Sequence, residues 1–340
     1  MKFKGYLKML GIGMVVTTML AVAGSVGAAD LPGKGTTVQP ARATWTTGFF
    51  LEALYSRALT DLGYEVRTPK DLSNPIFYQA VTQGDVDFWA NGWFPLHDAQ
   101  LPENFDAKAE KVGYVAQAAA LQGYLASKDL VEKYDITSLE DFKRDEVKKA
   151  FDDNGDGKAD LVACPPGWGC EKAITKHMKA YDLGDHINLI KAGYSASMAD
   201  AVARYEAGGP VFFYTWTPNW TVYKLQPGQD VLWLNVPEDL EGENTDASGI
   251  DGAVTDPIKM GFIPNDIVVV ANKDFLQDNP AAEKLFQVMY VPIQEIFAQN
   301  NKMFEGENKQ RDIERHVDEF IAKHKNKWNE WQQAAKEAAK

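Results

Sequence analysis

Three short segments place a tryptophan beside proline and glycine residues in a pattern that suits ligand binding. They read Trp93-Phe94-Pro95-Leu96-His97-Asp98, Cys164-Pro165-Pro166-Gly167-Trp168-Gly169-Cys170-Glu171 and Tyr214-Thr215-Trp216-Thr217-Pro218. In each segment, the tryptophan stands where a predicted strand or a Pro/Gly loop gives way to a predicted helix. Ligands of open α/β sheets bind at the carboxyl edge of the strands. A shared aromatic site is therefore one interpretation, and separate packing of each tryptophan in the core is the other.

A group of tryptophans has a definite chemical preference. Indole faces are the strongest cation–π partners among side chains. A trimethylammonium group suits them because it has no N–H whose hydrogen bonds to water would be lost. Each ring contributes roughly 0.5–2 kcal/mol, so three rings give about 2–6 kcal/mol. Micromolar binding needs roughly 8 kcal/mol, so a second contact must hold the other end of the ligand.

The second segment also offers a site for an anion. The backbone N–H groups of Gly169 and Cys170 lie at the start of a predicted helix, and Gly169 lets a ligand approach the backbone closely. His97 lies one helical turn after Trp93 and can donate to a carboxylate, although a surface or capping histidine is the alternative. We therefore predict a betaine-like zwitterion as ligand, and no catalytic residue or cofactor. The predicted ligand-binding residues are Trp93, His97, Trp168, Gly169, Cys170 and Trp216.

Alternating helices and strands must position these residues, which predicts an α/β fold. The first half predicts strands at 37–39, 64–66 and 86–89, with helices over 51–62 and 76–83. The second half predicts strands at 123–127, 210–215 and 267–271. Its predicted helices run from a Thr137/Glu140 capping box to Lys143, from a Ser197/Asp200 box to Glu206, from Asn279-Pro280 onward, and over 313–331, where Trp328 and Trp331 belong to the core.

No linker rich in proline or serine separates independent domains. Two lobes crossed twice by the chain fit the pattern better than two successive domains. We predict that residues 29–122 and 265–340 form lobe A, that residues 123–264 form lobe B, and that residues 1–28 are a signal peptide.

The N-terminus has the features of an export signal. Lys2, Lys4 and Lys8 precede an apolar segment at 9–23, and we place cleavage after Ala28, with an uncleaved anchor as the alternative. No cysteine lies near that site to carry a lipid. We expect a free, monomeric periplasmic protein without stable membrane insertion. Because that compartment is oxidising, Cys164 and Cys170 are expected to form a disulfide, worth about 2 kcal/mol.

Charge and acidic motifs exclude some function classes. The chain has 35 Lys and Arg against 48 Asp and Glu, a formal net charge of −13, which argues against nucleic acid as a partner. Asp152, Asn154, Asp156 and Gly157 imitate the start of a calcium loop, but the closing position holds Ala163. We predict no metal site and interpret this segment as a polar turn, with bound calcium as the alternative.

The motifs Trp-x-Pro-Leu-His-Asp, Pro-Gly-Trp-Gly-Cys-Glu and Tyr-Thr-Trp-Thr-Pro-x-Trp resemble those of a known family. The chain is similar to the periplasmic glycine betaine/proline betaine-binding proteins of osmoprotectant ABC importers, from Ala29 to the C-terminal helix. The resemblance implies the two-lobed type II periplasmic-binding-protein fold, whose lobes close over a ligand in the cleft between them.

The resemblance also assigns roles to residues. It implies that Trp93, Trp168 and Trp216 surround the quaternary ammonium group. It places the carboxylate contacts on His97 and on the backbone of Gly169 and Cys170, and it includes the disulfide between Cys164 and Cys170.

The expected function is that of a non-enzymatic receptor. It would capture glycine betaine or proline betaine and deliver it to the cognate ABC permease, which a cytoplasmic ATPase powers. One rival is an enzyme with Cys170 as nucleophile and His97 nearby, which a disulfide would prevent. The others are import receptors for a sugar, which needs more polar side chains around its hydroxyls, or for choline, which has no use for the anion donors.

Overall fold

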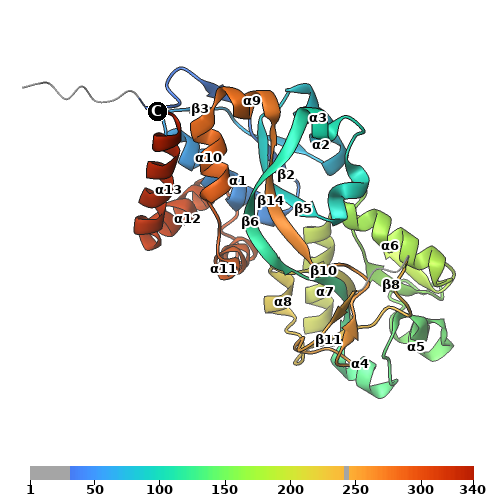
Figure 1. Ribbon diagram of the computed structural model, residues 1–340. Coiled ribbons are helices and arrows are strands. Elements are labelled where there is room, and N and C mark those ends of the chain that lie inside the picture. Colours follow the sequence, from blue (N-terminus) through green and yellow to red (C-terminus); the bar gives the residue numbers. More distant parts are fainter. Residues whose placement is uncertain (1–30, 241–244) are drawn as a thin grey trace, which may run out of the picture. The chain divides into compact units, whose positions relative to one another are not determined.

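The computed structural model describes residues 31–240 and 245–340, and residues 31–340 form one compact unit (Figure 1). The predicted signal peptide and its cleavage site lie outside the described residues. Within the described part of the chain, no helix combines the length and the apolar character that a membrane span requires.

Lobe A is built on a three-stranded antiparallel sheet with β14 in its centre. Its strands are β5 (Phe88–Phe94), β6 (Ala109–Ala120) and β14 (Asn265–Asn272). Two parallel strand pairs accompany it: β1 (Thr37–Val38) with β3 (Glu65–Val66), and β2 (Ala41–Ala43) with β4 (Lys70–Leu72). β14 is buried over nearly its whole length, as expected of a strand with a neighbour on both sides.

Helices from both ends of the chain belong to lobe A. They are α1 (Thr46–Asp61), α2 (Asn74–Gln83), η1 (Leu96–Gln100), α3 (Phe105–Lys108), α9 (Lys273–Asp278), α10 (Pro280–Val288), α11 (Ile293–Phe304), α12 (Gln310–Lys323) and α13 (Lys325–Ala338). The helix predicted over 51–62 is present as α1, which begins earlier, at Thr46, and buries Leu51, Leu54 and Ala58 fully. The predicted end of α2 at residue 83 is confirmed, and Gly84 follows it with a left-handed φ of 79°.

Lobe B is built on a mixed five-stranded sheet in the order β11-β7-β10-β8-β9. These strands are β7 (Gln122–Ser127), β8 (Ala159–Val162), β9 (Ile187–Ile190), β10 (Phe212–Trp216) and β11 (Val231–Leu234). The helices are α4 (Lys128–Lys133), η2 (Leu139–Lys143), α5 (Asp145–Ala150), α6 (Gly169–Ala180), α7 (Tyr194–Glu206) and α8 (Thr221–Lys224), and a small hairpin joins β12 (Asp246–Ala247) to β13 (Ile258–Lys259).

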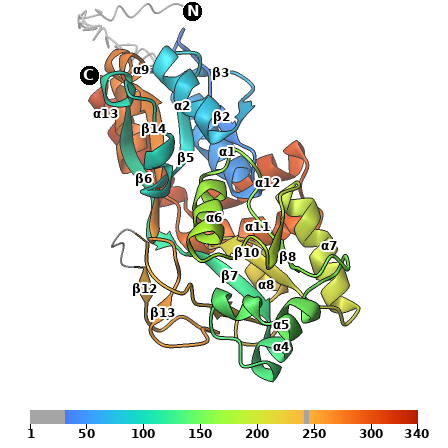
Figure 2. The same cartoon turned by 90° about the vertical axis from the view of Figure 1, so that its right-hand side faces the viewer.

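The chain passes between the two sheets at two places. Leu121 alone separates β6 of the first sheet from β7 of the second, and the chain returns to the first sheet where β14 begins at Asn265. The residue limits of the lobes stay a prediction. Figure 2 shows where α8 and α11 lie. A further contact joins these helices, since the Trp220 and Phe304 rings stack with centroids 3.9 Å apart.

The single predicted helix over 313–331 is wrong, because the segment forms two helices. α12 ends and α13 begins at His324, whose φ of −109° and ψ of 28° leave the helical range. The break lets α12 pack on α1 while α13 packs on α10. The His324 ring is held by Glu295 of α11, 3.1 Å from Nε2. Trp328 and Trp331 are buried, so their predicted place in the core is confirmed.

Two predicted capping boxes are also wrong in detail. The box at η2 is formed by Ser138 and Asp141, one residue later than predicted, since the Asp141 carboxylate accepts the backbone N–H of Ser138. α7 begins at Tyr194, before Ser197, because Gly193 occupies the cap position. Both helices end at the predicted residues.

The predicted cap of the next helix differs as well. Asn279 precedes α10, but its side chain donates to the Phe275 carbonyl instead of capping the helix.

Substitution of Gly113 by alanine tests the packing of β6 on α10. A methyl group there would overlap the backbone carbonyl of Phe286, which cannot move without displacing α10. We expect Gly113→Ala to lower the free energy of unfolding by about 3 kcal/mol in urea titrations. Gly184→Ala is the matched control, because the space around Gly184 is open. Equal stability of the two variants would contradict this packing.

Candidate ligand-binding site

A cavity lies where the two sheets approach each other. All six predicted ligand-binding residues line it. The complete lining consists of Trp45, Asn74, Trp93, Leu96, His97, Gln122, Trp168, Gly169, Cys170, Tyr214 and Trp216. None of these residue types carries a full charge at neutral pH, except histidine when it is protonated.

Trp93 and Trp216 are placed by the ends of two buried strands. Trp93 is the last residue but one of β5, and Trp216 is the last residue of β10. The predicted strand end at Trp216 is confirmed, whereas Trp93, which was predicted to follow its strand, lies inside β5. Trp216 pairs with Gln122 across β10 and β7, so the two side chains lie on the same face of the lobe B sheet. The strand ends therefore bring both indoles to the cavity.

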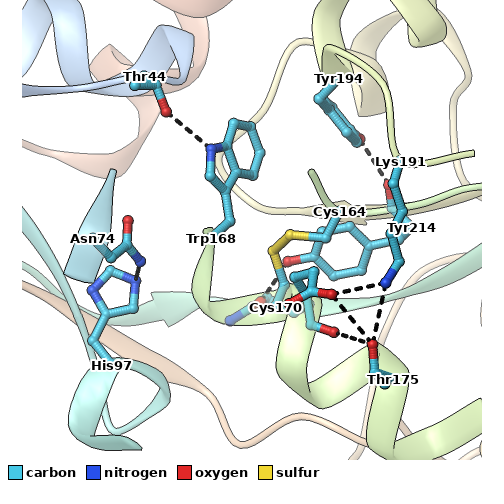
Figure 3. The surroundings of a disulfide bond; sticks show 12 residues. Thr44, Asn74, His97, Cys164, Trp168, Cys170, Thr175, Lys191, Tyr194 and Tyr214 are labelled. Atoms are coloured by element: carbon cyan, nitrogen blue, oxygen red, sulfur yellow. Dashed lines mark hydrogen bonds and ion pairs between the residues drawn. A yellow bond between two sulfur atoms is a disulfide. The ribbon is translucent and has the colours of Figure 1, made fainter. Parts of the chain in front are cut away.

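Trp168 lies at the N-cap of α6, as the predicted helix start requires. Its ring centroid lies 5.3 Å from that of Trp45 and 5.6 Å from that of Trp216, with interplanar angles of 67° and 79°. Rings at such angles present their faces as adjacent walls of a corner. The indole Nε1–H donates to the Thr44 hydroxyl at 2.9 Å (Figure 3).

The predicted disulfide between Cys164 and Cys170 is present, with Cα atoms 5.9 Å apart (Figure 3). It closes the loop between β8 and α6 that carries Trp168. The link leaves the loop few ways to move Trp168 away from the helix start. It also removes the free thiol that a nucleophilic Cys170 would need.

Gly169 and Cys170 are the first two residues of α6. Backbone N–H groups in this turn have no acceptor within the helix, and the helix dipole favours negative charge beside them. A Cβ atom at Gly169 would lie 2.8 Å from Cδ2 of His97 and 3.0 Å from Cδ2 of Leu96. Glycine is required here because side chains of lobe A approach the helix start this closely.

His97 is buried in η1, and three polar groups surround its ring. The backbone N–H of Trp93 donates to Nδ1 at 3.1 Å, and the Tyr78 hydroxyl lies 2.7 Å from the same nitrogen. The side-chain amide of Asn74 lies 2.8 Å from Nε2 (Figure 3). Because the Trp93 N–H can only donate, Nδ1 must be an acceptor, and the proton of the neutral ring sits on Nε2. That proton faces the Asn74 amide, whose oxygen must then be the atom that accepts it.

The electrostatics of the site follow from burial. Burial, with a smaller contribution from the Lys111 ammonium, lowers the pKa of His97 to about 3. The imidazole is therefore neutral at physiological pH, and the whole cavity lining is uncharged. Its polar character comes from dipoles: the start of α6, the ring N–H of His97 and the amides of Asn74 and Gln122.

Comparison with known proteins gives a consistent result. Residues 36–323 match the family described as the substrate-binding domain of the ABC-type glycine betaine transport system. The glycine betaine-binding periplasmic protein OusX of Dickeya dadantii is 44% identical over 329 residues, which cover 96% of this chain and 98% of that protein. The glycine betaine/proline betaine-binding periplasmic protein of Escherichia coli is 43% identical, with coverage of 92% and 94%.

The chain belongs to this family of substrate-binding domains. Its fold agrees with the crystal structure of the glycine betaine, L-proline-binding protein ProX of Borrelia burgdorferi, with a TM-score of 0.69 at 16% identity. That match covers 88% of this chain and 100% of the other. The expected two-lobed type II periplasmic-binding-protein fold is thereby confirmed.

Five residues of the cavity were not among the predicted site residues of this family member. They are Trp45, Asn74, Leu96, Gln122 and Tyr214. Leu96 and Tyr214 belong to the tryptophan segments, but nothing in the local sequence distinguishes the other three as site residues. Within the described residues, Gln122 Nε2 and Trp216 Nε1 are two cavity atoms that are buried without a hydrogen-bond partner. Buried polar atoms without partners are rare and call for an explanation, such as a ligand or water in the cavity.

The acidic turn lies away from these residues. Asp152 accepts hydrogen bonds from the backbone N–H groups of Gly155, Asp156 and Gly157, as in an Asx turn. Across residues 31–240 and 245–340, no group of three or more His, Cys, Asp or Glu side chains is arranged to hold a metal ion.

The protonation state of His97 can be measured directly. At pH 5 we expect ring ¹⁵N shifts of a neutral imidazole with the proton on Nε2, because that pH lies above its pKa of about 3. As pH falls from about 6.5 towards 3, His97 binds a proton in the unfolded chain but not in the folded protein. The free energy of unfolding therefore decreases over that pH range. The signal is assigned by its loss in His97→Asn. A titration midpoint near 6.5 would contradict the burial argument.

Proposed function

We propose that this protein captures glycine betaine or proline betaine in the periplasm and delivers it to the permease of an ABC importer for osmoprotection. Family membership supports the transport role. The observation that carries the choice of ligand is the uncharged cavity, which combines indole rings with a helix start and a neutral histidine. Such a lining suits a molecule that has both a bulky cation and an anion but no net charge.

The cation end of the ligand would lie among Trp93, Trp168 and Trp216. Trp168 and Trp216 meet at 79°, which gives a methylated ammonium two faces to contact at once. Trp93 and Trp216 are almost completely buried, so the rings act in a nearly dry environment. Cation–π contacts are strongest under those conditions, about 2 kcal/mol per ring.

The carboxylate end would accept from the backbone N–H groups of Gly169 and Cys170 and from Nε2–H of His97. Nδ1 of His97 is occupied by Trp93 and Tyr78 and Nε2 by the Asn74 amide, so Nε2–H would reach a carboxylate only in place of Asn74. Because Gly169 and His97 come from different lobes in the predicted division, the carboxylate would connect the lobes and favour closure.

The rival functions fit the cavity less well. A sugar needs several side-chain donors and acceptors around its hydroxyls, whereas this lining is mostly aromatic. Choline would leave the N–H groups of Gly169 and Cys170 without an anion. An enzyme with Cys170 as nucleophile is not supported, because that sulfur is bonded to Cys164. We infer a monomeric, non-enzymatic receptor that uses no cofactor and meets the permease and its ATPase after closing.

Calorimetric titration of the mature protein tests this function, with intrinsic tryptophan fluorescence recorded in parallel. We expect glycine betaine and proline betaine to bind and to change the fluorescence, and choline and maltose to bind weakly or not at all. Strong choline binding would refute the carboxylate site. Binding of maltose alone, or of none of the four, would refute the proposed function.

A His97→Ala variant separates the two ends of the ligand. It removes the Nε2–H donor, so affinity for glycine betaine should fall about tenfold or more, as for a hydrogen bond to a charged group. Affinity for tetramethylammonium, which has no carboxylate, should change much less. Trp168→Ala is the complementary control and should weaken both compounds. Equal losses for both compounds in His97→Ala would mean that the residue acts on structure instead.

A further inference from the structure

Two adjacent residues near the start of lobe A contact the same indole of lobe B. The Thr44 hydroxyl accepts from Nε1 of Trp168 at 2.9 Å, and the Trp45 ring meets the Trp168 ring at 5.3 Å and 67° (Figure 3 shows the first contact). The two partners are more than 120 residues away from Trp168 in the sequence. The orientation of Trp168 is therefore fixed by lobe A as well as by its own loop.

Thr44 and Trp45 are themselves held firmly. They connect β2, which pairs with β4, to α1, where Trp45 is the N-cap residue. The Trp45 ring is buried and packs against Trp89 with centroids 5.5 Å apart. At Gly48 a Cβ would clash with the side chain of Ala43, so the turn between β2 and α1 is tightly closed. The Thr44 hydroxyl is thus presented from a rigid position.

We propose that Thr44 is a positioning residue of the ligand site, which acts by orienting Trp168, with Trp45 as the backing of that ring. The inference rests on the proposed function, because it concerns the wall that Trp168 offers to a cationic group. Thr44 is absent from the cavity lining, so a direct contact with the ligand does not explain its placement.

The contact has a consequence for the order of assembly of the site. Trp168 would have its fixed orientation only when lobe A and lobe B are together, because Thr44 and Trp45 belong to lobe A. The aromatic corner formed with Trp216 is then completed by closure and not before it. Ligand affinity would include the free energy of forming the Thr44–Trp168 hydrogen bond.

Thr44→Val tests this role, since valine has the shape of threonine without the hydroxyl. Thr44 is exposed, so the substitution leaves the core intact, and melting temperatures serve to verify this. We expect affinity to fall about three- to tenfold, the usual range for one lost hydrogen bond. The loss should be the same for glycine betaine and for tetramethylammonium, because Trp168 faces the cation in both. Thr44→Ser keeps the hydroxyl and should restore affinity to within about twofold.

A double-mutant cycle shows whether the effect passes through Trp168. Trp168→Phe keeps an aromatic ring but removes the N–H that Thr44 accepts. In that background, Thr44→Val should cause no further loss of affinity. The same loss in both backgrounds, or no loss in the otherwise unchanged protein, would overturn the inference.

The outcomes also separate this inference from the proposed function. If the unchanged protein binds glycine betaine and Thr44→Val binds equally well, the positioning role alone is refuted. If the unchanged protein binds neither glycine betaine nor tetramethylammonium, the proposed function fails and the positioning role fails with it.

Discussion

The site depends on a cavity whose lining stays electrically neutral. A charged side chain buried there without a partner would cost several kcal/mol. Burial keeps His97 neutral, and the other lining residues are aromatic rings, amides, Leu96, Gly169 and the disulfide-bonded Cys170. A zwitterion can bind in this neutral cavity because each of its charges is stabilised by a fixed dipole or by the quadrupole of an aromatic ring. No protein ion has to be desolvated with it.

Because no charged side chain lines the cavity, backbone N–H groups must supply many of the hydrogen bonds to an anionic group. The start of α6 offers N–H groups whose direction is set by the helix, and Gly169 allows His97 and Leu96 to approach them. The disulfide between Cys164 and Cys170 fixes the same turn from the other side. Rigid donors lose little entropy when a ligand binds, which favours affinity without additional contacts. The loop around Trp168 therefore provides the N–H donors, the glycine that allows close approach and the disulfide that holds the turn.

The sequence was most informative where structure is determined locally. The tryptophans at strand ends, the helix start at Gly169 and the helix end at Gly84 follow from neighbouring residues, and all were predicted. Gln122 could not be found in this way, because only its pairing with Trp216 across β7 and β10 brings it to the cavity. Trp45 has the same limitation, as its place depends on β2, β4 and packing against Trp89. The break at His324 has no glycine or proline and depends on packing with other helices.

Two of the contacts that join the lobes beside the crossing strands differ in strength. Trp220 is almost fully buried and stacks on Phe304 over a centroid distance of 3.9 Å, so separating these rings would expose a large apolar surface. Thr44 and Trp168 share one hydrogen bond near solvent, where water can replace it at a cost of about 1 kcal/mol. If the cleft opens on the side of Thr44 while Trp220 and Phe304 stay in contact, Trp168 leaves Thr44 and Trp45, and the inferred positioning then couples lobe closure to formation of the cation site.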